Sequence, residues 1–409
     1  MAEMLRFATA GSVDDGKSTL IGRLLHDTKA LFDDQLDALA LSTARRGGEG
    51  LDLALVTDGL RAEREQGITI DVAHRYFSTP KRSFIIADAP GHARYTRNMV
   101  TAASTADVAV ILADASAGLV EQTRRHAAVT GLLGVGHVVL AVNKMDLVDW
   151  SESVFDDLAE EFAVLADAVG IDSVVPIPIS ALQGDNVVDR STEMGWYTGP
   201  TFLEHLETVE LAPPEAGSTG GRLPVQWVIR HEGVRHYAGP VVAGVLKPGD
   251  DVIVLPAGER SRIVSIDTHD GPLEVAEPWS SVSVTLADDL DVGRGDLIAT
   301  EPAPVVSREL EATVCWFAEK PLAVGDRLLV QHTTRVARAV VQELVDRLDV
   351  IDLSREEAPA SLALNDLGTI RLATATGLAV EPYKESRATG SLLLVDEVTN
   401  ATVGAAMVR

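Results

Sequence analysis

Short apolar runs alternate with amphipathic stretches over about the first 211 residues of the chain. Each run is long enough for one buried strand, and the stretches between the runs repeat apolar residues at helical spacing. This alternation predicts a mainly parallel sheet with flanking helices. The predicted strands are 5–10, 75–79, 83–89, 108–115, 137–143 and 174–180, and the predicted helices are 96–106, 121–133 and 153–169.

The pattern changes after residue 211. Residues 212–221, APPEAGSTGG, are rich in Pro, Gly and Ser, which is typical of a linker. Beyond them, short runs such as PVQWVIR, GPVVAGVL and DDVIVLP are separated by glycine-containing turns, a pattern typical of β-barrels or sandwiches. A further boundary is expected near 301–304. We therefore predict an α/β P-loop domain over 1–211 and two β-barrel domains over 222–303 and 304–409.

A glycine-rich loop follows the first predicted strand and precedes the helical sequence TLIGRLLH. Backbone N–H groups of such a loop, together with the start of the next helix, bind phosphates. Lys17 is expected to reach the β- and γ-phosphates, and the Ser18 hydroxyl to bind Mg²⁺. A chance match is the alternative, but the position between strand and helix disfavours it. The predicted phosphate-binding residues are Gly11, Ser12, Val13, Asp14, Asp15, Gly16, Lys17, Ser18 and Thr19.

A second motif closes the predicted strand SFIIA and consists of Asp88, Ala89, Pro90, Gly91 and His92. An aspartate at this position holds Mg²⁺ through its water shell. The Gly91 N–H is expected to bind a γ-phosphate, an interaction that ends when that phosphate is removed by hydrolysis. His92 is the candidate for positioning the attacking water, whereas the alternative is that it only caps the following helix.

Upstream of this motif, Thr69 is a candidate to close over the metal ion from the opposite side. A threonine in GITI could also be an ordinary strand residue, and only the other motifs favour the catalytic interpretation. The polar segment 28–65 does not follow the strand and helix alternation, and we predict short mobile helices over the nucleotide there.

The base is predicted from the motif after the strand HVVLAV, which consists of Asn143, Lys144, Met145 and Asp146. A carboxylate at Asp146 can accept from the ring N–H and the exocyclic amine of guanine, a paired donor edge that adenine lacks. Asn143 is expected to tie the loops together, and the Lys144 stem to lie over the base. A backbone N–H of Ser180, Ala181 or Leu182 is expected to meet the guanine oxygen. The five motifs together predict GTP and Mg²⁺ as ligands.

Composition narrows the possible partners and compartment. The formal net charge is −26, and residues 213–409 carry 18 Lys and Arg against 29 Asp and Glu, which disfavours extended contact with nucleic acid. No apolar run approaches the ~18 residues of a membrane span, and the start of the chain leads directly into the phosphate loop, so no leader is expected. The single cysteine, Cys315, fits a reducing cytoplasm and is expected to be a small buried hydrophobe.

The chain resembles the GTPase (large) subunit of bacterial sulfate adenylyltransferase. That subunit belongs to the elongation factor Tu/1-alpha group of GTPases. The resemblance covers the whole chain and includes GSVDDGKSTLIGRLLHDTK, DGLRAEREQGITIDVAHRYFST, FIIADAPGHARYTRNM, NKMDLVDWS, SALQGDNV, CWFAEKPL and RATGSLLLVDEVTNATVGAAMV. Elongation factors usually carry histidines where this loop has Ser12 and Asp15. Ala89 and Ala102 also depart from the family's frequent residues, but neither position contacts phosphate in the family.

The resemblance implies a function. In this family a small subunit joins sulfate to the AMP part of ATP and releases pyrophosphate, and GTP hydrolysis by the large subunit promotes that uphill synthesis of adenosine 5′-phosphosulfate. The ATP and sulfate site is then expected on the partner. In some relatives an adenylylsulfate kinase domain follows, but no second phosphate loop is present in the 409 residues, so kinase activity is not expected of them.

Two alternatives remain at this point. One is a factor that delivers a charged tRNA to ribosomes, which the acidic β segments and the Ser12 and Asp15 loop disfavour. The other is a regulatory GTPase with a protein partner outside sulfur metabolism. We expect neither nucleic acid nor membrane to be a partner.

Overall fold

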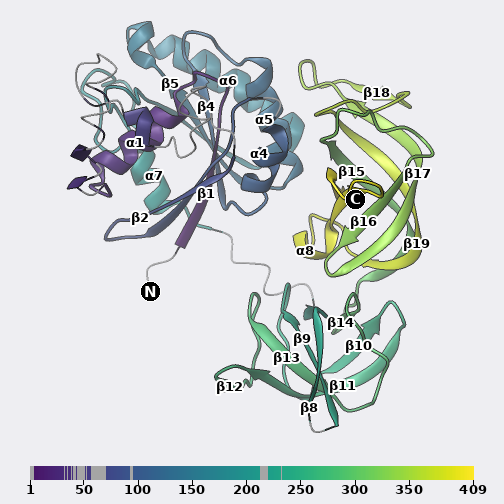
Figure 1. The fold of residues 1–409 in the computed structure, drawn as a ribbon. Coiled ribbons are helices and arrows are strands. Elements are labelled where there is room, and N and C mark those ends of the chain that lie inside the picture. Colours follow the sequence, from purple (N-terminus) through teal and green to yellow (C-terminus); the bar gives the residue numbers. More distant parts are fainter. Residues whose placement is uncertain are drawn as a thin grey trace. The chain divides into compact units, whose positions relative to one another are not determined.

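The computed structural model describes residues 4–31, 33–34, 36–37, 39, 43, 51, 53–56, 71–92, 95–211, 220–231 and 233–409. The chain forms two compact units, one of Met1–Leu211 with Val350–Leu353 and one of Ala212–Asp349 with Ser354–Arg409 (Figure 1). Thr69, most of the predicted helical segment 28–65 and most of the predicted linker lie outside the described residues. The division into three domains stays a prediction.

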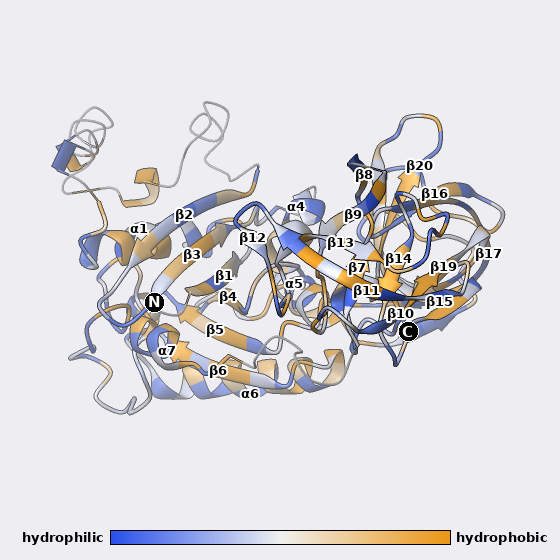
Figure 2. Ribbon diagram, turned by 90° about the horizontal axis from the view of Figure 1, so that it is seen from below, coloured by the Kyte–Doolittle hydropathy of each residue, from blue (hydrophilic) through white to orange (hydrophobic). Residues whose placement is uncertain are grey.

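The first unit is built on a six-stranded sheet of order β2-β3-β1-β4-β5-β6. All neighbouring pairs are parallel except β2 and β3, which are antiparallel, so the predicted mainly parallel sheet is confirmed. Strand β5, of which all residues but the first are buried, is coloured as hydrophobic in Figure 2, as expected for a strand covered on both faces. The strands are β1 (Met4–Ala10), β2 (Ala73–Ser78), β3 (Ser83–Asp88), β4 (Val108–Asp114), β5 (His137–Asn143) and β6 (Ser173–Pro178).

Helices cover both faces of this sheet. Figure 1 shows α1 (Lys17–Asp27) and α7 (Phe202–Thr208) on one side, and α4 (Thr96–Ala103), α5 (Glu121–Leu132) and α6 (Glu152–Val169) on the other. This unit also contains two 3-10 turns, η1 (Leu53–Val56) and η3 (Met145–Val148). Local chemistry sets the helix ends: the Ser151 side chain accepts the Val154 N–H at the start of α6, and Gly170 ends it with φ 78°.

The second unit contains two antiparallel sheets. The first has the order β7-β14-β10-β11-β13-β9-β8, with β12 paired to β11, and the second has the order β16-β20-β21-β15-β19-β17-β18. An additional pairing of β16 with β17 closes six strands of the second sheet into a ring, which is how a barrel removes its edges. Cys315 on β15 is buried, as predicted.

The strands of the first of these sheets are β7 (Arg222–Pro224), β8 (Trp227–His231), β9 (Val234–Pro240), β10 (Asp251–Leu255), β11 (Glu259–Thr268), β12 (Gly271–Pro272), β13 (Ser281–Leu286) and β14 (Leu297–Ala299). The elements of the second are β15 (Val305–Trp316), β16 (Arg327–His332), β17 (Arg335–Leu348), β18 (Arg355–Glu357), β19 (Leu367–Val380), α8 (Arg387–Gly390), β20 (Ser391–Asp396) and β21 (Thr402–Val408).

One predicted strand, GPVVAGVL, is wrong in most of its length. The strand is β9, which precedes it and ends at Pro240. The rest of the run is apolar because it packs inward: Val241 and Leu246 are fully buried, although the backbone makes only isolated bridges. Gly244, with φ 58°, interrupts the extended conformation. A buried loop therefore has the same apolar pattern as a strand.

A buried ion pair joins segments of the two sheets of the second unit. The Arg222 guanidinium on β7 lies 2.8 Å from Glu381 Oε1 and 3.2 Å from Glu381 Oε2. It also donates to the carbonyls of Thr300 and Pro302, and Thr389 Oγ1 donates to the same Glu381 carboxylate at 2.6 Å. Arg222 is fully buried, so its charge depends on these acceptors.

We predict that Arg222→Ala lowers the free energy of unfolding by about 3–5 kcal/mol, because it leaves the buried Glu381 carboxylate without its cation. Urea unfolding of the full chain measures this. The matched control is Arg260→Ala, whose pair with Glu301 is exposed at both side chains, so its loss is expected to change the free energy of unfolding much less. Equal losses in the two variants would contradict the prediction.

Candidate nucleotide-binding site

The predicted nucleotide-binding motifs meet at one edge of the six-stranded sheet. Strands β1, β3, β5 and β6 run parallel, and each is followed directly by one of the motifs. In open α/β sheets, ligands bind at the carboxyl ends of the strands. The structure describes every predicted site residue except Thr69.

The phosphate loop has a backbone conformation that only glycine permits at one position. Gly16 has φ 88°, and a Cβ atom there would lie 2.4 Å from Asn143 Nδ2. The Gly16 carbonyl then accepts the Leu20 N–H at 2.9 Å, which starts α1 directly after the loop. Ser18 and Thr19 lie in the first turn of this helix, where unpaired N–H groups are available to an anion. Val13 and Asp14 are exposed at the loop's tip.

Asn143 connects three of the motifs. Its Nδ2 donates to the Asp15 carbonyl at 2.7 Å, and its Oδ1 accepts the Ala181 N–H at 2.9 Å. The side chain is only 2 % exposed, so both partners would be left buried and unpaired without it. The predicted role of Asn143 in tying the loops together agrees with these contacts.

The predicted base-binding residues also contact each other. Ser180 Oγ donates to Asp146 Oδ1 at 2.7 Å, which orients the carboxylate and leaves Asp146 Oδ2 for another donor. Met145 is fully buried and its N–H reaches the Ile179 carbonyl, so it anchors the segment rather than facing a ligand. Leu182 is 68 % exposed, whereas Ala181 is buried.

Lys144 has a partner that was not predicted from the sequence. Its Nζ lies 2.7 Å from Asp114 Oδ2, at the end of β4. Burial alone would raise the pKa of Asp114, but hydrogen bonds from Lys144 and Ser116 outweigh it and lower the pKa from its usual value. The signal was present, because Asp114 ends a buried apolar strand in the same way as Asp88.

Lys17 and Asp88 form a buried ion pair at the phosphate side of the site. The distance from Lys17 Nζ to Asp88 Oδ1 is 2.8 Å, and Thr9 Oγ1 donates to the same oxygen. The second carboxylate oxygen, Asp88 Oδ2, is buried and makes no hydrogen bond among the described residues. A buried carboxylate oxygen without a donor is costly, so this atom suits the water shell of a Mg²⁺ ion.

Gly91 packs directly against the phosphate loop. A Cβ atom at this position would lie 2.3 Å from the Gly11 carbonyl oxygen and 3.1 Å from the Ser12 carbonyl carbon, so any side chain would force the two segments apart. Ala89 donates its N–H to Thr9 and is buried, as is Pro90. His92 is exposed, and the N-cap position of α4 is held by Tyr95, not by His92.

Asp15 holds the phosphate loop from inside. Its carboxylate accepts the Ser12 N–H, and only 6 % of the residue is exposed. Burial, together with the charges of Asp114 and Asp14, raises the pKa of Asp15 to about 6, although the Ser12 hydrogen bond and Lys144 oppose this. Asp15 is therefore mostly ionised at neutral pH, but its ionised form is less favourable in the folded chain than in the unfolded chain.

We predict that Asp15→Asn stabilises the chain above pH 6 and has no such effect near pH 4. The ionised carboxylate disfavours folding only where Asp15 is deprotonated, so the cost grows from pH 4 to pH 6 and then stays constant. Asparagine keeps an acceptor for the Ser12 N–H. The gain at pH 7.5 is at most about 3 kcal/mol, measured by urea unfolding. Asp14→Asn, at the exposed neighbour, is the control, and a pH-independent gain for Asp15→Asn would refute the mechanism.

His126 is a second residue whose position was not predicted from the sequence. It is buried on α5, and its Nδ1 makes no hydrogen bond among the described residues. Burial, and then the positive charges of Lys17 and Arg125, lower its pKa to about 3, so it is neutral at physiological pH. Nothing in its sequence context distinguishes it from an ordinary helix residue. Across the described part of the chain, no group of three or more His, Cys, Asp or Glu forms a further metal site.

Family models match both ends of the chain. The model "Elongation factor Tu GTP binding domain" matches residues 2–214, and "GTP-eEF1A C-terminal domain-like" matches residues 309–409. The first match includes every predicted site residue. A domain of this family binds GTP, in agreement with the guanine specificity predicted from Asp146.

Curated relatives are similar over the whole chain. Sulfate adenylyltransferase subunit 1 of Laribacter hongkongensis (strain HLHK9) is 48% identical, with 100% of this chain and 85% of the relative covered. Bifunctional enzyme CysN/CysC of Mycobacterium tuberculosis (strain CDC 1551 / Oshkosh) is 52% identical, with 100% and 67% covered. Bifunctional enzyme NodQ of Rhizobium sp. (strain BR816) is 50% identical, with 99% and 64% covered. The chain thus spans about two thirds of the length of these bifunctional relatives.

Proposed function

The chain belongs to the sulfate adenylyltransferase subunit 1 family, and on this basis we propose that it is the GTP-hydrolysing subunit of a sulfate adenylyltransferase. Its hydrolysis of GTP promotes the synthesis of adenosine 5′-phosphosulfate and pyrophosphate from ATP and sulfate, the first step of sulfate assimilation. A small subunit carries the ATP and sulfate site. The complex works in the cytoplasm, without nucleic acid or membrane as partners.

The observation that carries the GTPase part is the connection of the phosphate and base motifs through Asn143. One side chain holds the carbonyl of Asp15 in the phosphate loop and the N–H of Ala181 beside the base-binding residues. Ser180 orients the Asp146 carboxylate in the same corner of the site. These shared contacts support a single site that binds the phosphates and the guanine base together.

The roles of the site residues follow from their chemistry. The loop N–H groups from Gly11 to Thr19 and the Lys17 ammonium bind the phosphates, for which Lys17 exchanges its Asp88 partner for phosphate oxygens. Asp146 reads the guanine edge, and the Lys144 stem covers the base. His92 positions the attacking water, whose oxygen ends on inorganic phosphate while the β–γ bridging oxygen leaves with GDP.

The residues present fit a magnesium ion at the phosphate side of the site. Ser18, Asp88 and Thr69 would hold it, and the buried Asp88 Oδ2, which has no donor among the described residues, is the observation that supports this. The ion would neutralise charge that develops on the β- and γ-phosphate oxygens. Thr69 is assigned to this site from its sequence motif alone.

Coupling requires that GTP binds some conformations of the complex more tightly than others. Gly91 packs on the backbone of Gly11 and Ser12, so a γ-phosphate that recruits the Gly91 N–H must move this segment relative to the loop. The segment after Gly91 leads into α4, which can transmit such a shift to a partner.

Of the described helices, none is long and apolar enough to cross a membrane.

We predict that this chain, mixed with a sulfate adenylyltransferase small subunit, ATP and sulfate, forms adenosine 5′-phosphosulfate in amounts that rise when GTP is added. His92→Ala is expected to bind GTP normally and to hydrolyse it about 10²-fold more slowly, because the attacking water is no longer oriented. Product then no longer rises with GTP. Phosphosulfate and phosphate are both measured.

Equal product with and without GTP would refute the coupling and leave a regulatory GTPase. Tight, GTP-dependent binding of an aminoacyl-tRNA in a filter assay would instead support the tRNA-delivering alternative.

We predict that Asp146→Asn lowers the preference for GTP over ATP by about 10²-fold or more, since the amide cannot accept both guanine donors. Asparagine keeps the oxygen that accepts from Ser180 Oγ, so the local structure is preserved. Its N–H₂ matches xanthine, which carries an oxygen where guanine has its amine, so XTP affinity should rise. Calorimetry with the three nucleotides tests both changes, and an unaltered GTP preference would contradict the base assignment.

A further inference from the structure

Arg23 on α1 contacts the segment 180–182, although it is not one of the predicted site residues. Its Nε donates to the Ala181 carbonyl at 3.2 Å, and its Nη2 donates to the Leu182 carbonyl. The third nitrogen, Nη1, lies 3.6 Å from Asp27 Oδ1, one turn further along α1. All three nitrogens of the guanidinium therefore have an acceptor, which fixes the plane of this rigid group. Through Arg23, the helix that begins at the phosphate loop holds the backbone of a base-binding motif.

The 180–184 turn packs on the side chain of Arg23. The Gly184 N–H closes this turn by donating to the Ser180 carbonyl at 2.7 Å. A Cβ atom at Gly184 would lie 3.5 Å from Arg23 Cδ, so the turn lies close to the stem of the arginine. Helix α1 is itself packed into the core of the first unit by Leu20 and Leu24. Arg23 thus supports the turn from a fixed position.

Within the part of the chain that the structure describes, the 180–184 turn has one N–H left for a ligand. Four of its five N–H groups donate to protein acceptors: Ser180 to the Asp185 carbonyl, Ala181 to Asn143 Oδ1, Gln183 to Ser180 Oγ, and Gly184 to the Ser180 carbonyl. The Leu182 N–H donates to no described residue. Of the three residues predicted to meet the guanine oxygen, Leu182 is therefore the one whose donor is available.

Arg23 determines the direction of this N–H. The Ala181 carbonyl and the Leu182 N–H belong to one trans peptide unit, in which the two groups lie in one plane and point in opposite directions. Because Arg23 holds the carbonyl toward α1, the N–H is held on the side away from α1. The bond from Arg23 to the Leu182 carbonyl fixes the next peptide unit as well. The N–H cannot turn without the loss of one of these two hydrogen bonds.

We propose that Arg23 is a positioning residue for guanine recognition, and that it holds the Leu182 N–H in place to donate to the guanine oxygen. The proposal rests on the proposed function, because it takes the guanine site at Asp146 as its premise. Ser180 of the same turn donates to Asp146, so one turn supports both groups that meet the edge of the base. Adenine carries an amine in place of the guanine oxygen, so an N–H fixed at this position also disfavours ATP.

The test compares three triphosphates whose bases differ at single positions of this edge. ITP keeps the oxygen and the ring N–H of guanine but lacks the exocyclic amine that Asp146 accepts from. The triphosphate of 2-aminopurine riboside keeps that amine but lacks the oxygen and the ring N–H. Loss of the Leu182 contact therefore weakens GTP and ITP equally and leaves 2-aminopurine unaffected, whereas damage to Asp146 changes the ratio of GTP to ITP affinity.

Arg23→Gln is expected to raise the Kd of GTP and of ITP about tenfold, as the loss of one hydrogen bond does, and to leave the Kd of the 2-aminopurine nucleotide unchanged. Arg23→Lys keeps one charged donor and is expected to lose less. Arg190→Gln is the matched control, because Arg190 also donates to a loop carbonyl, that of Gly199, at 2.9 Å but does not contact the 180–184 turn. Calorimetry with the full chain measures each Kd, and the unfolding midpoint of each variant is measured beside it.

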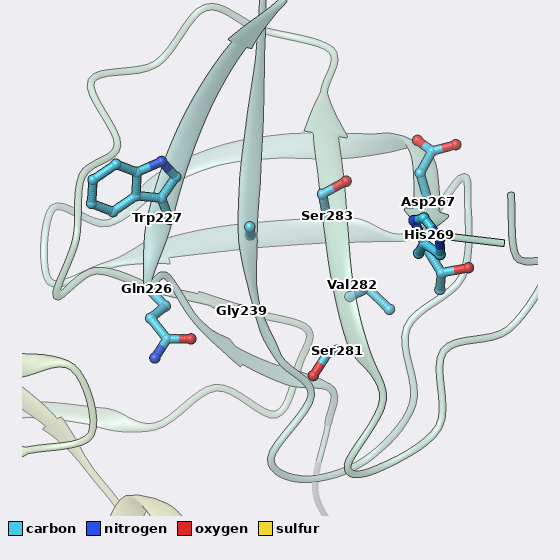
Figure 3. Close-up of a pocket in the computed structure, with 10 residues that line it drawn as sticks. Gln226, Trp227, Gly239, Asp267, His269, Ser281, Val282 and Ser283 are labelled. Atoms are coloured by element: carbon cyan, nitrogen blue, oxygen red, sulfur yellow. The ribbon is translucent and has the colours of Figure 1, made fainter. Parts of the chain in front are cut away.

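The calorimetric stoichiometry is expected to be one nucleotide per chain. A separate pocket of about 400 Å³ lies on the first sheet of the second unit, with Trp227 and Asp267 in its lining (Figure 3). Among the described residues that line it, none is lysine or arginine, so a triphosphate would meet a carboxylate there without a compensating cation. The measured affinities therefore refer to the site in the first unit.

If the parent chain binds GTP no more tightly than ATP, the guanine site of the proposed function fails and the inference fails with it. If the parent prefers GTP, and Arg23→Gln either keeps its GTP affinity or binds all three nucleotides equally more weakly, the inference alone is overturned. An altered ratio of GTP to ITP affinity in Arg23→Gln would assign the effect to Asp146 and would also overturn it. So would a loss in Arg190→Gln as large as that in Arg23→Gln.

Discussion

The nucleotide site depends on the two hydrogen bonds of one buried amide. Asn143 ends β5 and is paired with the Asp15 carbonyl on one side and the Ala181 N–H on the other. Without it, the phosphate loop and the segment after β6 would each keep an unpaired buried group, at about 1–3 kcal/mol apiece. The Asn143 side chain also requires glycine at position 16, because a Cβ atom there would lie 2.4 Å from Asn143 Nδ2. The loop's backbone and the base-binding segment thus share one support.

Both lysines of this site already have a carboxylate partner. A bound nucleotide would therefore replace existing ion pairs rather than add new ones. Lys17 is neutralised by Asp88, and Lys144 by Asp114, within the chain itself. Under the proposed function, phosphate oxygens would take over Lys17 and a metal ion would take over Asp88, so little new charge would be desolvated. The backbone N–H groups of the loop add to anion binding without adding a charged group that would have to be desolvated.

Much of the first unit could be predicted from the sequence because its strands are buried on both faces and its motifs follow strands at fixed places. The predicted strands 108–115 and 137–143 differ from β4 and β5 by at most one residue. GPVVAGVL failed because an inward-packing loop and a strand share one apolar pattern. The Lys144–Asp114 pair depends on β4 and β5 lying side by side, and the burial of His126 depends on how α5 packs. Local periodicity encodes neither packing, although Asp114 itself could have been singled out, because it ends a buried strand in the same way as Asp88.

The proposed nucleotide site has to bind an anion on a chain whose net charge is −26. Lysine, loop N–H groups and a helix start offset that repulsion locally. Backbone dipoles supply positive potential without adding a charge that must itself be desolvated, so the chain can stay strongly acidic elsewhere and still favour a polyanion at this one place.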